Sequence, residues 1–162
     1  MRGKWIVALV VGLIVMAIAG AVLATPGSGF TAAQQWKGVF GDIDVHLVDM
    51  PGHQVKVKTN GVSDVYVTRN AIAVDGHSGW HTHPGPSLIM VTVGEIMAYD
   101  GDDPTCTPTL YTTGEGFVDE GGGHVHLLRN ESGAPAETVA IQFLPKDATR
   151  RIDMPDPGNC SF

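Results

Sequence analysis

Hydrophobic and polar residues alternate over short stretches along most of the chain after residue 42. Alternation with a period of two is typical of a β-strand with one buried face, and turn-forming pairs stand between these stretches. Pro51-Gly52 and Asn60-Gly61 are two such pairs. This part of the chain therefore predicts short strands, at residues 43–47, 54–58 and 64–69.

The same pattern continues toward the C-terminus, where glycine and proline separate the stretches. Further short strands are expected at residues 71–74, 87–93, 95–99, 110–112, 117–118, 124–129 and 139–143. Gly94 is expected to turn a hairpin between two of them, and residues 124–129 are expected to pair with residues 139–143. No stretch after residue 24 sustains a helical period, so the pattern predicts an all-β fold, either a closed barrel or a double sheet.

The N-terminus has a different pattern, because residues 5–24 are uncharged and mostly aliphatic and follow the basic residues Arg2 and Lys4. As a hydrophobic helix this run would be about 30 Å long, the thickness of a bilayer core. Residues 1–24 are therefore predicted to be either a signal peptide or an N-terminal membrane anchor. The basic residues should stay in the cytoplasm, so the rest of the chain is expected to be extracytoplasmic, secreted or anchored.

The remaining sequence has the length of one domain. Residues 25–36 begin with Thr-Pro-Gly-Ser-Gly and show no periodicity, so a linker or N-terminal arm is expected there. Residues 37–162 are then predicted to form a single β-barrel domain.

Charge limits the partners of this domain. The chain has 10 basic and 17 acidic residues, and residues 25–162 keep all of the acidic residues but lose Arg2 and Lys4, which leaves a formal charge of −9. A surface this acidic argues against nucleic acid as a partner.

The chain has two cysteines, Cys106 and Cys160, far apart in sequence. In an exported domain such a pair forms a disulfide more often than a metal or catalytic pair. We therefore expect a bridge that ties the C-terminal tail to the loop after Asp100.

The chemistry of the chain centres on its histidines. His81 and His83 are two residues apart, so they point to the same side if the segment is extended. A third imidazole from a distant strand would complete a set of three neutral nitrogen ligands with open positions for a substrate or water.

Both halves of this arrangement resemble the motifs of the cupin family. The first motif is matched by Gly76, His81-Thr82-His83 and Gly94. The second is matched by Gly116, residues 121–123 (Gly-Gly-Gly), His126 and Asn130, with Gly121 where the family usually has proline. The resemblance covers roughly residues 70–144 and implies a double-stranded β-helix, the jelly-roll barrel of the cupins, in which His81, His83 and His126 bind a metal ion.

One position departs from the family pattern. The carboxylate that usually follows the histidine pair is replaced by Ser87 or Leu88, neither of which is a good metal ligand. The sequence is therefore similar to the three-histidine subset of cupins, which implies a divalent ion such as Fe, Mn, Zn or Cu. An ion held by neutral ligands keeps its full charge and favours an anionic ligand or hydroxide. His124 is a candidate fourth ligand, because it would share the face of His126 if the strand has already begun.

Two functions are consistent with these residues. The first is a metal-dependent enzyme for a small molecule, with oxygenase chemistry as one activity that the resemblance implies. The second is a metal-free cupin module that binds or senses a small-molecule ligand without catalysis. The resemblance also implies a homodimer, and the predicted anchor would add the membrane through residues 5–24 if it is not cleaved.

Overall fold

The protein, in a computed structural model that describes residues 23–162, is built from β-strands. No helix in this range is long and apolar enough to span a membrane. The leader predicted for residues 1–24 lies outside the described residues except for Leu23 and Ala24. In chain order the strands are β1 (Ser28–Phe40), β2 (Asp44–Met50), β3 (His53–Lys58), β4 (Ser63–His77), β5 (His81–Thr82), β6 (Ser87–Val93), β7 (Glu95–Asp100), β8 (Thr109–Thr112), β9 (Gly116–Asp119), β10 (His126–Arg129), β11 (Ala136–Pro145) and β12 (Ile152–Asp153).

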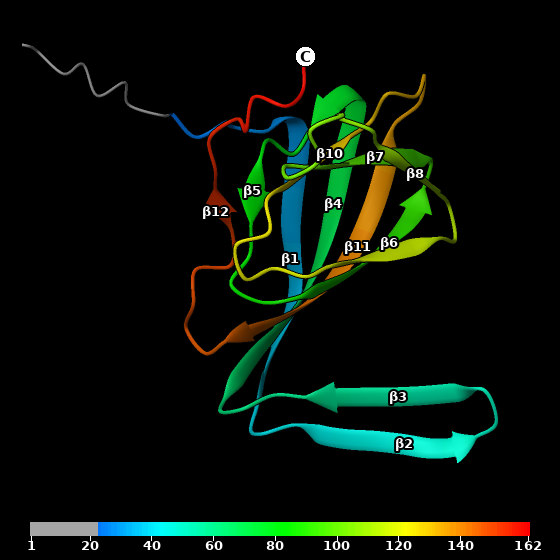
Figure 1. The fold of residues 1–162 in the computed structure, drawn as a ribbon, viewed down its shortest axis with the longest axis vertical. Coiled ribbons are helices and arrows are strands. Elements are labelled where there is room, and N and C mark those ends of the chain that lie inside the picture. The colour runs from blue at the N-terminus through cyan, green and yellow to red at the C-terminus, as the bar shows by residue number, and fades with distance from the viewer. Residues whose placement is uncertain (1–22) are drawn as a thin grey trace, which may run out of the picture.

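Most of these strands form one 10-stranded sheet that curls into a nearly closed barrel (Figure 1). The hydrogen-bonded order is β12-β5-β10-β4-β11-β6-β9, with β1 added to β4 and with β7 between β10 and β8. One half of the barrel thus holds β1, β4, β11, β6 and β9, and the other holds β12, β5, β10, β7 and β8. The halves are joined where His77, the last residue of β4, pairs with Arg129 of β10. β2 and β3 form a separate hairpin below the barrel in Figure 1.

Two predicted strand pairings are wrong. β6 and β7 adjoin at Gly94 but do not pair, because β6 lies between β11 and β9 whereas β7 lies between β10 and β8. Gly94 has a φ of 71°, and it turns the chain from one half of the barrel to the other instead of closing a hairpin. Likewise, β10 does not pair with β11, and both strands pair with β4 instead.

The barrel also begins earlier than the sequence predicts. Part of residues 25–36, expected as a linker or arm, belongs to β1, which starts at Ser28 and runs antiparallel to β4 until Phe40 pairs with Ser63. β1 is an edge strand with β4 as its neighbour, and most of its side chains are exposed. A strand that buries so little of either face leaves no alternating pattern in the sequence.

Two apolar clusters pack on opposite faces of β10, because Leu127 and Leu128 are consecutive residues of that strand. Burial of each large aliphatic side chain contributes about 1.5–3 kcal/mol, and the larger cluster, which draws residues from both halves of the barrel, holds them together. The larger cluster contains Ile72, Val91, Ile96, Leu128 and Ala136. The second contains Trp80, Tyr99 and Leu127. Because Trp80 directly precedes His81, the second cluster fixes the start of β5, the strand that carries His81.

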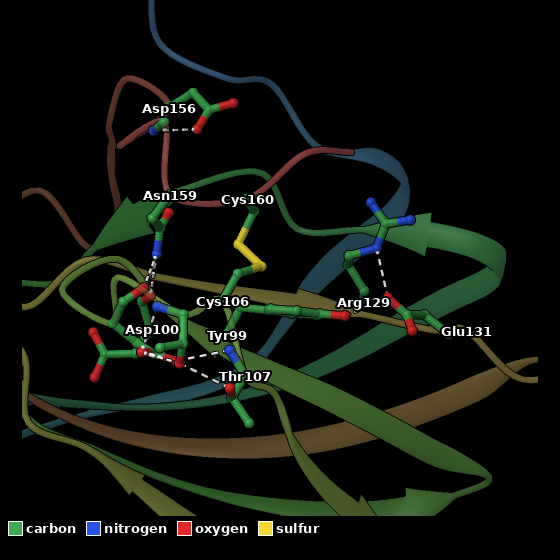
Figure 2. Close-up of a disulfide and its surroundings, with 12 residues drawn as sticks. Tyr99, Asp100, Cys106, Thr107, Arg129, Glu131, Asp156, Asn159 and Cys160 are labelled. Carbon is green, nitrogen blue, oxygen red and sulfur yellow. Dashed lines mark hydrogen bonds and ion pairs between the residues drawn. A yellow bond between two sulfur atoms is a disulfide. The ribbon is translucent and has the colours of Figure 1, made fainter.

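The predicted disulfide is confirmed. Cys106 and Cys160 are bridged (Figure 2). Both cysteines pack against the cluster of Trp80. Beside the bridge, the Asn159 side chain donates hydrogen bonds to the carbonyl oxygens of Asp100 and Asp103, at 2.9 and 2.6 Å. The C-terminal tail is therefore held against the loop that follows β7.

Candidate metal centre

Two strands and the residue that follows one of them place the predicted histidines at one point inside the barrel. His81 lies in the short strand β5, where it pairs directly with His126 of β10 and with Asp153 of β12. Directly opposed residues of antiparallel strands have their side chains about 5 Å apart on the same face, which explains why His81 and His126 meet. His83 follows two residues after His81, and its ring comes to the same side.

The three imidazoles converge closely. Their ring centroids are 4.2 Å apart for His81 and His126, 5.0 Å for His81 and His83, and 5.6 Å for His83 and His126. One ring nitrogen from each histidine lies within 4.8 Å of one from each of the others. All three residues are buried, with exposed fractions of 4%, 6% and 6%. The sequence-predicted ligands are thus brought together, and they could hold a metal ion.

Backbone carbonyl groups orient two of the rings. The Nδ1 atom of His81 is 2.9 Å from the oxygen of Gly79, and Nδ1 of His83 is 2.6 Å from the oxygen of Arg150. A carbonyl oxygen only accepts, so each Nδ1 carries the hydrogen and each Nε2 keeps its lone pair. Histidines that bind metals are commonly fixed in this way by a hydrogen bond from the other ring nitrogen.

The third ring has unmet hydrogen-bonding capacity. Neither Nδ1 nor Nε2 of the buried His126 has a hydrogen-bond partner among the described residues. A buried polar atom without a partner costs free energy, so such atoms at one point call for an explanation. A metal ion at the convergence of His81, His83 and His126 would take one of these two nitrogens, and the donor set therefore fits a divalent ion.

The protonation states also suit metal binding. Burial, reinforced by the neighbouring His126, lowers the pKa of His81 well below its usual value. Burial likewise lowers the pKa of His83 from 6.5 to about 4. Both rings are therefore neutral at neutral pH, and only a neutral imidazole can donate a lone pair to a metal.

A buried carboxylate that the sequence analysis did not single out lies beside the histidines. Asp119 ends β9, is 2% exposed, and places Oδ1 at 3.3 Å from Nδ1 of His126 and Oδ2 at 3.9 Å from Nε2 of His83. Burial alone would raise the pKa of Asp119, but its close approach to His126 and the N–H of Gly121 outweigh burial and lower it below the usual value. Asp119 is therefore an anion in direct contact with the candidate ligands.

The structure also decides which residue takes the place of the family carboxylate. Ser87 is fully buried and lines the cavity of the histidines, whereas Leu88 is 44% exposed on the outer face. Ser87 is therefore the inward-facing residue of this position. Its Oγ accepts a hydrogen bond of 3.2 Å from the side-chain nitrogen of Gln142.

His124 does not join the three-histidine group. Its Nδ1 is 3.5 Å from Oδ1 of Asp119, and its Nε2 is 3.2 Å from Oδ2 of Asp100. Burial lowers the pKa of His124, but the two carboxylates outweigh this effect, so the net shift is upward. With Asp119 and His126 it forms a second set of groups that could hold a metal.

The glycine run before His126 has a structural reason. Gly121 has a φ of 65°, which proline cannot adopt, and a Cβ there would lie 2.2 Å from the oxygen of Gly85. The next residue, Gly122, donates its N–H to the carbonyl of His83 at 2.8 Å. The departure from proline at residue 121 therefore allows this turn to pack on the segment that carries His83.

A small cavity adjoins the three histidines. Its volume is about 30 Å³, and Arg150 and Arg151 contribute to its wall, together with Phe30 and Ala32 of β1. Roughly 10–15 Å³ is needed for one water molecule, so this space is suited to an ion with a very small ligand. A second cavity of about 150 Å³ lies on the other side of His126, lined mainly by Tyr99, Tyr111, Phe117, Asp119 and His124.

Comparisons with known proteins identify the fold. No protein-family model and no curated protein matches the sequence. Among solved structures, the polyketide cyclase RemF from Streptomyces resistomycificus matches with a TM-score of 0.52 and 16% identity, over 84% of this chain and 81% of that chain. An oxalate oxidase matches with a TM-score of 0.48 and 23% identity, over 56% of this chain and 46% of that chain, so the match spans less than half of that protein. A cupin domain from Bordetella pertussis matches with a TM-score of 0.44 and 20% identity, over 65% of this chain and 95% of that chain. The likeness to RemF shows that the two chains share a fold, and the strand order and nearly closed barrel agree with the double-stranded β-helix expected from the sequence.

Proposed function

We propose that this protein binds a divalent metal ion through His81, His83 and His126 and holds a small anionic molecule beside it. The observation that carries the proposal is the convergence of three buried imidazoles whose nitrogens lie within 4.8 Å of one another. Two of these rings already have their tautomers set by backbone carbonyls, so little reorganisation is needed before an ion can bind.

Imidazole nitrogen suits Fe, Zn and Cu, and a nearby carboxylate suits Mn. The ligand set therefore favours one of these four ions. When bound, such an ion acts as a Lewis acid that polarises an oxygen ligand or lowers the pKa of bound water. The chain itself orients the rings and buries them away from bulk water.

The charge of the cavity wall favours an anion as the molecule bound beside the metal. Arg150 is half-buried, and it forms no ion pair with a carboxylate in the part of the chain that the structure describes. One of its nitrogens, Nη1, donates to Oε1 of Gln142 at 3.0 Å, and burial lowers the pKa of its guanidinium. A buried cation with free N–H groups is stabilised by a carboxylate or a similar anion.

The proposed setting is outside the cytoplasm. The Cys106–Cys160 disulfide supports this placement, because such bonds persist in oxidising compartments and are rare in reducing ones. Residues 1–24 would then direct export and either be removed or retain the barrel at the membrane surface.

Metal content tests the first part of the proposal. The full-length chain, purified in mild detergent with a tag that lacks histidine, is incubated with Zn²⁺ or Mn²⁺, desalted and assayed by elemental analysis. We expect one bound ion per chain, and we expect H81A/H83A to lose it. H53A is the matched control, because His53 is exposed on the hairpin of β2 and β3 and should not affect binding. Equal metal content in H81A/H83A and the wild type would refute the assignment.

Anion binding tests the second part. Acetate is titrated into the Co²⁺-loaded chain while the visible absorption of the ion is recorded. A hydrogen bond to a charged group is worth about 1.5–3 kcal/mol, so R150Q should weaken acetate binding by about 10-fold or more and leave metal affinity intact. R69Q serves as the control, since Arg69 pairs with Glu137 on the outside of the barrel. Unchanged acetate affinity in R150Q would contradict the role of Arg150.

The second cavity favours one alternative function. It is larger than the first, it is lined by Tyr99, Tyr111 and Phe117, and it does not include His81 or His83. A barrel that uses this space as a metal-free receptor for a small molecule would keep its ligand after H81A/H83A removes the metal. Ligand binding that survives this double variant would therefore support a binding or sensing module.

A further inference from the structure

We propose that Asp119 is the carboxylate ligand of this centre, supplied from β9 in place of the one that is missing from β6. The inference rests on the proposed metal site and names its fourth ligand. The sequence motif offers Ser87 at the usual position of the acid, and a serine hydroxyl is a poor ligand for these ions. The structure places a carboxylate, that of Asp119, on the strand beside this position.

Strand pairing explains how a residue so far along the chain can take over this role. Ser87 and Asp119 are direct partners in the antiparallel pair of β6 and β9. Such partners have their Cβ atoms about 5 Å apart on the same face of the sheet, so their side chains lie next to each other. Both residues are buried; Ser87 lines the cavity of the three histidines and Asp119 the second cavity, and His126 borders both cavities.

The two oxygen atoms of Asp119 have different surroundings. Oδ1 accepts the N–H of Gly121 at 3.1 Å and faces Nδ1 of His126 at 3.3 Å, so it orients the turn and the ring. Oδ2 is buried without a hydrogen-bond partner and lies 3.9 Å from Nε2 of His83, the nitrogen that keeps its lone pair. The oxygen without a partner is thus the one that faces the proposed ligand nitrogen of His83.

Charge compensation leads to the same assignment. Within residues 23–162, the ion-pair partners of Asp119 are His83, His124 and His126, and none is a lysine or arginine. An ionised carboxylate in such a buried place needs a cation or several hydrogen bonds, and Oδ2 has neither. A divalent ion between Oδ2 and the three imidazoles would supply the missing positive charge.

The test compares Co²⁺ binding by the full-length wild type, D119N, and the swap S87D/D119N. D119N keeps the size of the side chain and an oxygen that can accept from Gly121, but it removes the charged ligand. Loss of a residue that only orients a ligand costs about 10–100-fold in metal affinity. We expect a loss of about 100-fold or more in D119N, recovery to within about 10-fold in the swap, and altered visible bands of Co²⁺ in D119N at saturation. E120Q is the control, since it removes one acid from the exposed neighbouring residue.

The visible bands and the Co²⁺ affinity of D119N decide whether Asp119 is a ligand. Visible bands of saturated D119N that are identical to those of the wild type would overturn the assignment, because the coordination sphere would then be unchanged, whatever the swap does. Affinity of D119N within about 3-fold of wild type would overturn it as well, since loss of even an orienting residue costs more. A wild type that binds no Co²⁺ would overturn both this inference and the proposed function, whereas a failure confined to D119N leaves the three-histidine site standing.

Discussion

Acidification should destabilise the metal-free protein through His83. The pKa of His83 is 6.5 in the unfolded chain and about 4 in the folded barrel, because burial penalises the charged ring. Between these two values the unfolded chain binds a proton that the folded chain does not, so stability falls as the pH falls. From about pH 7 to about pH 5 the loss from this one group is about 2 kcal/mol, and it approaches about 3 kcal/mol near pH 4.

Urea unfolding of the chelator-treated protein measures this loss. Tryptophan fluorescence is a suitable signal, because Trp80 is 1% exposed and directly precedes His81. The matched variant is H83Q, whose amide can still donate to the carbonyl of Arg150 but cannot titrate. The lowered pKa of His81 adds to the loss of stability on acidification, whereas the raised pKa of His124 opposes it. Both effects are present in the wild type and in H83Q.

We therefore expect the loss of stability between about pH 7 and about pH 5 to be about 2 kcal/mol smaller in H83Q than in the wild type. Identical losses in the two proteins would show that His83 has the same pKa folded and unfolded, and so does not cause the acid sensitivity. Saturating metal should protect the wild type at neutral pH and lose this effect on acidification, because protons compete with the ion for the imidazoles.

Further variants test the disulfide and the glycine turn before His126. Replacing both cysteines in C106S/C160S releases a link between residues 54 apart in sequence, and the chain-entropy model predicts a loss of about 4 kcal/mol in urea unfolding; a loss below about 1 kcal/mol would contradict it. G121A should reduce the free energy of unfolding more than G122A does, although Gly121 and Gly122 have similar φ values of 65° and 64°. The left-handed backbone costs about 1–2 kcal/mol in both, but only the methyl group at residue 121 meets a neighbour, the oxygen of Gly85. Equal losses in the two glycine variants would show that this close approach does not matter.

The histidine centre could be predicted from the sequence because each of its two halves lies within a short stretch of the chain. His81 and His83 share a face through the period of a strand, and His126 stands in a second motif at a fixed spacing from Asn130. Asp119 could not be found in the same way, since it meets the site only through the pairing of β6 with β9. The signal that existed was the acidic pair Asp119-Glu120, between Val118 and the glycine run.

The positions of the strands were likewise easier to predict than which strands pair with each other. Residues 87–93 form β6 as expected, but the alternation that predicts a strand does not say which strand lies beside it. Gly94 therefore indicated a hairpin, where the chain instead passes from one half of the barrel to the other. β1 was missed because an edge strand that is exposed on both faces has no hydrophobic periodicity. Only its first part reaches the site, where Phe30 and Ala32 line the histidine cavity.

A crystal structure of the Zn²⁺- or Mn²⁺-loaded protein, with anomalous diffraction at the absorption edge of the metal, would locate the bound ion itself. We expect one strong peak inside the barrel, about 2.0–2.2 Å from Nε2 of His81, Nε2 of His83 and a ring nitrogen of His126, with Asp119 Oδ2 at a similar distance. A peak at another place, or no peak inside the barrel when the crystals hold excess metal, would contradict this expectation.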